Sequence, residues 1–299
     1  MEQSERQRIV DGLRKYVARY PSQNKAAASL KGVSAATVSA ILNGNHDLIS
    51  EEMWRNVANQ TSRAISPRDW AIIGTRVFNE VQAALADAQE NGMFRWIVGR
   101  AGRGKTTAAN YYAAEHKNVF VLLCSRRMTT RILLRELARK VGVRTTGMVE
   151  YDMVEAIADG LMQLDSPLLI FDEADKLTDK PFSLFLDLYN RIEFYCGIAA
   201  MSPDVIEHRI SKNIGKKEGY DEIESRMGRR YFELAKIAPV EIASICMANG
   251  IKDDKDIAEI VDLANETHCD LRAVRAEIRR RKAMAAARRT SSQKQSNNS

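Results

Sequence analysis

One segment of this 299-residue chain restricts its possible folds more than any other. The apolar run at residues 93–98 leads directly into Gly99-Arg-Ala-Gly-Arg-Gly104-Lys105-Thr106, and a helical pattern follows. This order of strand, glycine-rich loop and helix is the context in which the pattern G-x-x-x-x-G-K-[ST] binds nucleotide phosphates. The glycines let backbone N–H groups surround a phosphate, and the helix N-terminus adds positive charge. The segment therefore predicts a P-loop.

Short apolar runs alternate with helical patterns on both sides of this loop. The predicted strands are residues 93–98, 119–124, 168–171, 197–201 and 231–234, and the predicted helices between them are residues 108–116, 129–141, 149–164 and 182–194. Nearly continuous apolar strands separated by helices are typical of a parallel sheet covered on both faces. We therefore expect an α/β fold with a parallel five-stranded sheet.

Composition and patterning divide the rest of the chain. With 45% hydrophobic and 28% charged residues, the chain can bury a full core. We expect an all-α domain at residues 1–62, the nucleotide-binding core at 63–235, a small helical lid at 236–286 and a disordered basic and polar tail at 287–299.

The net charge of +6 permits a polyanionic partner without proving one. No apolar run approaches the roughly 20 residues that span a bilayer, and the N-terminus is too polar for a signal peptide. We expect a cytoplasmic protein without a membrane partner.

The P-loop assigns roles to individual side chains. Lys105 is expected to reach the β- and γ-phosphates, and the Thr106 hydroxyl to ligate Mg²⁺. The remaining predicted phosphate contacts are Gly99, Gly102, Gly104 and Thr107.

An apolar strand at residues 168–171 ends in Asp172-Glu173. This order places one carboxylate beside the metal and the next beside the attacking water. Asp172 is predicted to hold Mg²⁺ and Glu173 to act as the general base. An Asp followed by Glu favours hydrolysis over nucleotide binding alone.

Arginines in the C-terminal part of the chain could place positive charge beside the γ-phosphate. Arg226, Arg229 or Arg230 could enter a neighbouring subunit's site as an arginine finger, and the alternative is a solvated basic loop. Arg272, in the lid, could fold over the nucleotide or form a structural ion pair. Residues 70–75 precede the first strand and could border the adenine.

Residues 23–44 show a helix-turn-helix pattern, with a tight turn at Gly32 and a second helix capped by Ser34. The exposed side chains of that second helix are short, so we expect sequence-tolerant DNA binding; they are Ala35, Thr37 and Ser39. Contacts to phosphates are expected from Lys25, Lys31, Arg126, Arg127, Lys212, Lys216 and Lys217. A helical module for protein contacts is the alternative.

Together the P-loop, the Asp-Glu strand end, the late arginines and the helical lid resemble the AAA+ ATPases. With a helix-turn-helix in front, the layout is similar to the B-type transposition proteins of phage Mu. This resemblance implies ATP and Mg²⁺ as cofactors, double-stranded DNA and a DDE-type transposase as partners, and ATP-dependent self-assembly into a helical filament.

One position departs from the AAA+ pattern, and two other functions fit the same motifs. The fourth strand ends at Ser202, where AAA+ proteins usually place a longer polar residue that orients water, so we expect slow hydrolysis. A helicase loader or replication factor would use the same ATPase. An ATP-switched transcriptional regulator would use the same helix-turn-helix, and a closed ring is the alternative to a filament.

Overall fold

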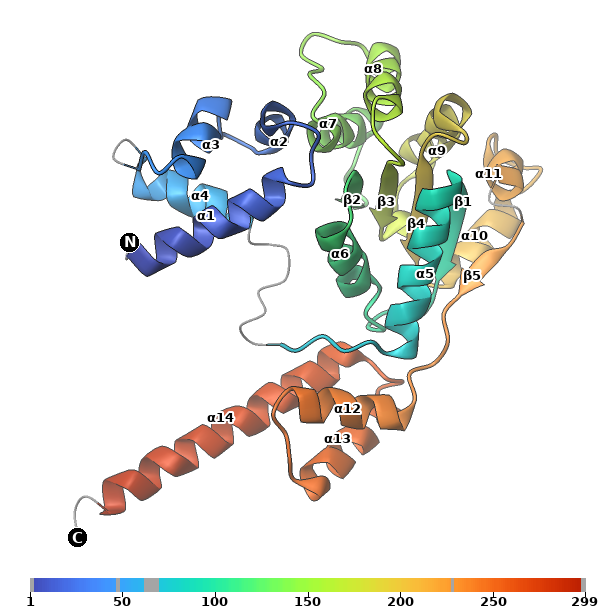
Figure 1. Ribbon diagram of the computed structural model, residues 1–299. Coiled ribbons are helices and arrows are strands. Elements are labelled where there is room, and N and C mark those ends of the chain that lie inside the picture. Colours follow the sequence, from blue (N-terminus) through green and yellow to red (C-terminus); the bar gives the residue numbers. More distant parts are fainter. Residues whose placement is uncertain (1–2, 47–48, 62–69, 227–228, 297–299) are drawn as a thin grey trace.

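The computed structural model describes residues 3–46, 49–61, 70–226 and 229–296. Its first four helices form a group beside the rest of the chain (Figure 1). They are α1 (Gln3–Val17), α2 (Gln23–Ser29), α3 (Ala35–Leu42) and α4 (Glu51–Thr61). Their apolar sides meet in one cluster that includes the fully buried side chains of Leu13, Ile41 and Trp54. The predicted domain boundary after residue 62 lies outside the described residues.

Helices α2 and α3 lie on either side of the turn at Gly32, where the sequence predicts the two helices of a helix-turn-helix. Each begins at a serine cap: the Lys25 N–H donates to Ser22 Oγ at 3.2 Å, and the Thr37 N–H donates to Ser34 Oγ at 3.0 Å. Gly32 in the turn has φ +67°, a backbone conformation that glycine adopts without strain. Local capping and one glycine therefore explain why this pattern was recognisable in the sequence.

The five strands form one parallel sheet in the order β2-β3-β4-β1-β5. They are β1 (Phe94–Val98), β2 (Val119–Leu123), β3 (Leu168–Asp172), β4 (Gly197–Ser202) and β5 (Tyr231–Glu233). The predicted five-stranded parallel sheet is confirmed. Because β1 lies between β4 and β5, the loop after β1 emerges beside the end of β4, and the end of β3 follows one strand further along the same edge.

Helices cover both faces of the sheet (Figure 1). Along β1, Trp96 packs into one hydrophobic cluster and Ile97 into the other, which explains the nearly continuous apolar strands. The helices of the core are α5 (Arg76–Asn91), α6 (Lys105–Glu115), α7 (Thr130–Val141), α8 (Glu150–Met162), α9 (Asp179–Ile192), α10 (Val205–Asn213) and α11 (Tyr220–Arg226), with a 3₁₀ turn η1 (Ala174–Lys176).

Three helices follow the sheet: α12 (Pro239–Ala248), α13 (Asp254–Glu266) and α14 (Leu271–Ser296). Helix α14 continues to Ser296, into the residues from 287 onward for which the sequence predicts a disordered tail. The physical reason is local: after Leu271 the chain contains neither glycine nor proline, and it is rich in alanine and arginine, which favour helix. Figure 1 shows this helix projecting away from the rest of the molecule. Within the described ranges, no helix is both long and apolar enough to cross a bilayer.

Candidate functional site: a nucleotide pocket beneath a helical lid

The predicted P-loop connects the end of β1 to the first turn of α6. Its start is fixed to the sheet by the Gly99 N–H, which donates to Ser202 O at 3.2 Å. Gly102 and Gly104 have φ +80° and +92°, values that favour glycine at both positions. The loop and the N-terminus of α6 therefore form the kind of N–H-rich cradle that binds phosphate. Thr107, in the same first turn, lines the adjoining cavity.

Lys105 bends back over this loop. Its Nζ donates to Gly99 O and, at 3.2 Å, to Arg100 O. Burial lowers the pKa of Lys105, and the charge of Arg103 adds to that effect while the charge of Asp172 opposes it. Among the described residues, its ammonium has backbone carbonyls but no carboxylate as hydrogen-bond partners. A phosphate in the cradle would supply the missing counter-charge.

Thr106 and Asp172 meet at the carboxyl edge of the sheet. The Thr106 hydroxyl donates to Asp172 Oδ2 at 2.7 Å, and Asp172 is only 2% exposed. Burial raises the pKa of Asp172 and the charge of Glu173 raises it further, whereas the hydrogen bond from Thr106 lowers it. A hydroxyl and a carboxylate at one point are the oxygen ligands that Mg²⁺ takes beside a P-loop. The residues present therefore fit ATP with Mg²⁺.

Glu173 borders the same cavity but already has a partner. Its N–H donates to Asp172 Oδ1 at 3.0 Å, and its carboxylate forms an ion pair with Lys176. Its φ of +57° is uncommon for a residue with a side chain. A base that acts on water would have to share this carboxylate with Lys176, so the role of Glu173 stays a prediction.

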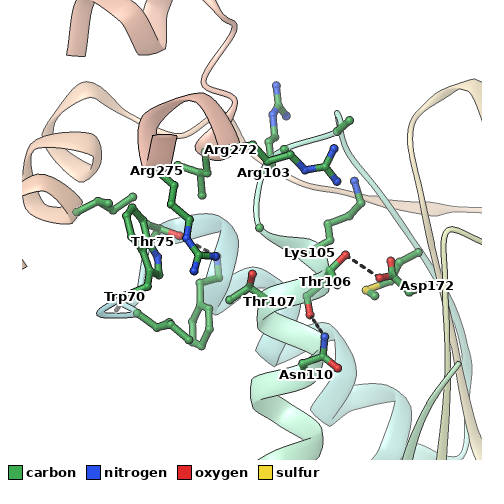
Figure 2. Close-up of a pocket in the computed structure, with 18 of the residues that line it drawn as sticks. Trp70, Thr75, Arg103, Lys105, Thr106, Thr107, Asn110, Asp172, Arg272 and Arg275 are labelled. Carbon is green, nitrogen blue, oxygen red and sulfur yellow. Dashed lines mark hydrogen bonds between the residues drawn. The ribbon is translucent and has the colours of Figure 1, made fainter. Parts of the chain in front are cut away.

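The cavity has a volume of about 410 Å³, and it is lined by the segment before α5, by the core and by the lid. Figure 2 shows Lys105, Thr106 and Asp172 on one side and Trp70 and Arg275 on the other. Most of residues 70–75 line the cavity, which is where the sequence analysis expected them. The Asn249 side chain pairs with both the N–H and the C=O of Ala71, at 2.8 and 3.1 Å, and so fixes this segment against the end of α12.

The start of α14 lies directly on the P-loop. The Leu271 N–H donates to Gly102 O at 2.9 Å, and Asp270 Oδ1 accepts the Arg272 N–H at 2.8 Å. Arg272 lines the cavity, and its guanidinium has no carboxylate partner among the described residues. Within the described ranges, Arg272 therefore has no partner for the alternative structural ion pair, and it lies beside the cavity.

Ser202 lies where the sequence analysis expected a residue that orients water. The residue lines the cavity, but its Oγ accepts a hydrogen bond from Trp96 Nε1 at 2.8 Å and the residue is 1% exposed. This hydroxyl satisfies a buried indole N–H, which would otherwise carry a desolvation cost. Ser202 therefore has a structural partner that the sequence analysis did not predict.

The three candidate finger arginines do not line their own chain's cavity. Arg226 donates to Asn190 Oδ1 at 3.2 Å, and its guanidinium lies over the Tyr189 ring at 5.3 Å. Arg229 and Arg230 are exposed just before β5. This placement leaves both hypotheses open, a finger for a neighbouring subunit and a solvated loop.

Within the helix-turn-helix, the predicted DNA contacts have different environments. Ala35 is exposed, the Thr37 hydroxyl lies 2.8 Å from Ser34 Oγ, and Ser39 Oγ accepts from Asn43 Nδ2 at 3.2 Å. Lys31, predicted to contact phosphate, donates to Glu136 Oε1 of α7 at 2.8 Å, and its side chain is largely exposed. This ion pair forms because the N-terminal helices pack on α7, which no local pattern predicts, and the phosphate contact of Lys31 stays a prediction.

The other basic candidates are spread over the surface. Lys25 is half-buried, and its backbone packs against Gly142. Arg126 and Arg127 are exposed directly after β2, and Lys212 and Lys216 are exposed near the end of α10. Lys217 forms an ion pair with Asp179 at 2.7 Å. The structure therefore does not gather these residues into one surface.

Two arginines at the pocket were not predicted from the sequence to lie there. Arg103 is buried, and its Nη1 donates to Leu234 O and Ala235 O at 3.3 Å each, which ties the P-loop to the end of β5. The Arg275 guanidinium lies over the Trp70 ring at 5.3 Å. Arg275 follows Arg272 by three residues and so shares its helix face, which is the signal that could have identified it.

Comparisons with known proteins agree with this geometry. Residues 88–200 match the family model of the AAA domain. The chain is also similar to "Mu-like prophage FluMu DNA transposition protein B" of Haemophilus influenzae. The two are 24% identical over 271 residues, which cover 88% of this chain and 93% of that protein.

Proposed function

We propose that this chain is a B-type transposition protein with an AAA+ ATPase domain, which binds ATP and, in that state, assembles on double-stranded DNA. The assembly selects the target DNA and recruits and activates a DDE-type transposase in the cytoplasm of a bacterial cell. One observation supports this proposal most strongly: Lys105, Thr106 and Asp172 converge on a cavity that the lid also lines. They do so in a chain similar over most of its length to a protein named for DNA transposition.

Different residues of the pocket bind different parts of the nucleotide. The P-loop N–H groups and Lys105 hold the phosphates, while Thr106 and Asp172 hold Mg²⁺, directly or through its waters. Glu173 takes a proton from water once its carboxylate is released from Lys176. Bound ATP with Mg²⁺ supplies the phosphoanhydride whose hydrolysis ends the DNA-bound state. Hydrolysis is slow because Ser202, which already accepts from Trp96, is a short substitute for a longer polar residue.

The lid couples the nucleotide to assembly. Because Leu271 donates to Gly102, any change in the P-loop changes the support of α14. Arg272, in the lid, then contacts the phosphates of the bound nucleotide. Arg226, Arg229 or Arg230 completes the site of the next subunit, and such a head-to-tail interface continues as a filament unless it closes into a ring.

DNA binding is proposed to depend on the phosphate backbone. Ala35, Thr37 and Ser39 are too short for bidentate contacts with bases, so the helix-turn-helix discriminates weakly. Arg126 and Arg127 are exposed at the end of β2 and add positive charge. If about six to ten phosphates are neutralised per bound unit, affinity falls roughly 10³–10⁵-fold between about 50 and 200 mM salt.

Footprinting in the presence of ATP tests the proposal. Broad protection of any duplex, together with stimulated strand transfer by the transposase, is the expected result. Protection of one discrete operator would replace it with an ATP-switched regulator. Stimulation of helicase loading without any effect on a transposase would replace it with a helicase loader.

Glu173→Gln adds a test of the chemistry. The variant should bind ATP, hydrolyse it far more slowly and stay on DNA longer. The matched control is Glu207→Gln, at a glutamate of α10 that does not line the pocket. Rapid turnover by Glu173→Gln would remove Glu173 as the base.

A further inference from the structure

A second cavity, of about 750 Å³, lies between the N-terminal helices and the edge of the sheet. Residues of α1, α4 and the turn after α2 line one side, and residues of β2 and α7 line the other. Contacts from α7 hold the two sides together: Arg139 donates to Ser29 O, and Glu136 accepts from Lys31. We call this cavity the interdomain cleft. Thr106 and Asp172 also border it, but the proposed nucleotide chemistry leaves the rest of it unused.

Four basic side chains line the interdomain cleft: Arg19 and Lys31 from the N-terminal helices, and Arg139 and Lys140 from α7. Glu136 is the carboxylate among them, and it accepts from Lys31 and from Arg139, both at 2.8 Å. Burial acts to raise the pKa of Glu136, but these two hydrogen bonds lower it overall. Glu136 is therefore the carboxylate that hydrogen-bonds to these cations, while Asp172 lines the cleft elsewhere and Glu115 acts on Arg19 only through its charge.

Arg19 and Lys140 have no carboxylate as a hydrogen-bond partner within the described part of the chain. The Nε atoms of Arg19 and Arg139 are buried without a hydrogen-bond partner there. Burial, reinforced by the neighbouring charge of Arg139, lowers the pKa of Lys140 to about 8. Arg19 and Lys140 are half-buried, and cations that are partly removed from water without a paired carboxylate destabilise a structure unless something compensates them. A bound anion would provide that compensation.

We propose that the interdomain cleft is a binding site for phosphate groups, formed jointly by Arg19 and Lys31 of the N-terminal helices and Arg139 and Lys140 of the core. Two guanidinium groups and two ammonium groups match the oxygens of a phosphate better than those of a single carboxylate. The volume suits a small phosphorylated molecule or a short stretch of single-stranded nucleic acid. It is too small for a duplex.

A ligand in this site would affect how firmly the N-terminal helices are held against the core. Because its cations come from both sides of the cleft, an occupant joins the N-terminal helices to α7. The negative charge of the occupant would offset the repulsion between the Arg139 and Lys140 side chains, which partial burial strengthens. Occupancy therefore holds the helix-turn-helix against the core, and loss of the phosphate loosens it.

Calorimetric titration of the full chain tests the site. All proteins in this experiment carry Lys105→Ala, which removes the main cation of the P-loop, so that the P-loop competes less for the probes. Two probes are used, pyrophosphate and a single-stranded oligothymidylate of about eight nucleotides. In this background Lys140→Met is compared with Lys252→Met, which changes an exposed lysine of the lid that does not line the cleft.

We expect at least one probe to bind, and Lys140→Met to weaken that binding about tenfold or more, while Lys252→Met leaves it unchanged. Binding of pyrophosphate identifies a small phosphorylated ligand, and binding of the oligonucleotide alone identifies a nucleic-acid strand. If Lys140→Met does not fold, judged by circular dichroism, Arg19→Gln takes its place. The proposal would be overturned if neither probe binds, or if Lys140→Met weakens binding no more than Lys252→Met does.

Discussion

The lid is joined to the phosphate loop by one backbone hydrogen bond, in which Leu271 N–H donates to Gly102 O at 2.9 Å. Gly102 has φ +80°, and a Cβ at this position would lie 2.1 Å from Asp270 Oδ1. The residue therefore has two reasons to be glycine: its backbone conformation and the close approach of the lid. A nucleotide that moves this loop also moves the start of α14.

Gly102→Ala should disrupt both the lid contact and nucleotide binding. Gly147→Ala is the matched control, because Gly147 has φ +81° but a Cβ added there would meet no atom within 4 Å. Both variants bear similar backbone strain, on the order of 1–3 kcal/mol, so the difference between them isolates the collision with Asp270. Titration with a fluorescent ATP analogue should show weaker binding for Gly102→Ala alone. Equal binding by the two variants would mean that the lid contact does not matter.

Ser202→Ala should lower the free energy of unfolding by about 1–3 kcal/mol, because it leaves the buried Trp96 Nε1–H without an acceptor. Ser211→Ala, on the exposed side of α10, should have little effect. Urea unfolding followed by tryptophan fluorescence measures the difference. A variant of unchanged stability that lost hydrolysis would instead assign Ser202 to the positioning of water.

Glu136→Gln should loosen the N-terminal helices from the core. The change weakens the ion pairs with Lys31 and Arg139, which are partly exposed and contribute about 0.2–1 kcal/mol each. Hydrogen exchange should become faster in α2. DNA binding without ATP should strengthen by a few fold, because Lys31 is then free to reach phosphate. Glu266→Gln, at an exposed glutamate of the lid, serves as control, and the same response there would contradict the role of Glu136.

The interdomain cleft should respond to pH through Lys140. The pKa of Lys140 falls from 10.5 to about 8 in the folded protein, mainly because of burial and then because of Arg139, with Glu136 opposing and Lys31 adding to the shift. Between these values the unfolded chain binds more protons than the folded chain, so this residue makes folding more favourable as the pH rises. Below about pH 8, Lys140→Met should melt at a higher temperature than the unchanged protein, and the gap should close toward about pH 10. A gap independent of pH would contradict the shifted pKa.

The parts of this fold that the sequence predicted depend on local chemistry. The strand before Gly99 and the helix from Lys105 follow from apolar runs and glycine positions, and the order of the strands makes Asp172 lie beside Thr106. The serine cap at Ser34 placed the second helix of the helix-turn-helix. Each of these features is encoded within a few residues.

The parts that were missed depend on contacts between distant segments. Lys31 and Glu136 are 105 residues apart, and Trp96 and Ser202 are 106 apart. Periodicity and capping carry no information about such pairs, which arise only when whole elements pack. The continuation of α14 was not predicted for a different reason. A disordered tail was expected because this segment has no large apolar side chains to bury, whereas its helix propensity alone accounts for the helix.

The central claim is that ATP switches assembly on DNA, and one measurement tests it directly. Binding to random-sequence duplex is measured with ATP, with ADP and without nucleotide, while electron microscopy follows particle size, for the unchanged protein and for Lys105→Ala. The account predicts extended assemblies on any duplex with ATP alone, and none with Lys105→Ala. Full binding by Lys105→Ala, or discrete sequence-dependent binding that ignores the nucleotide, would contradict it.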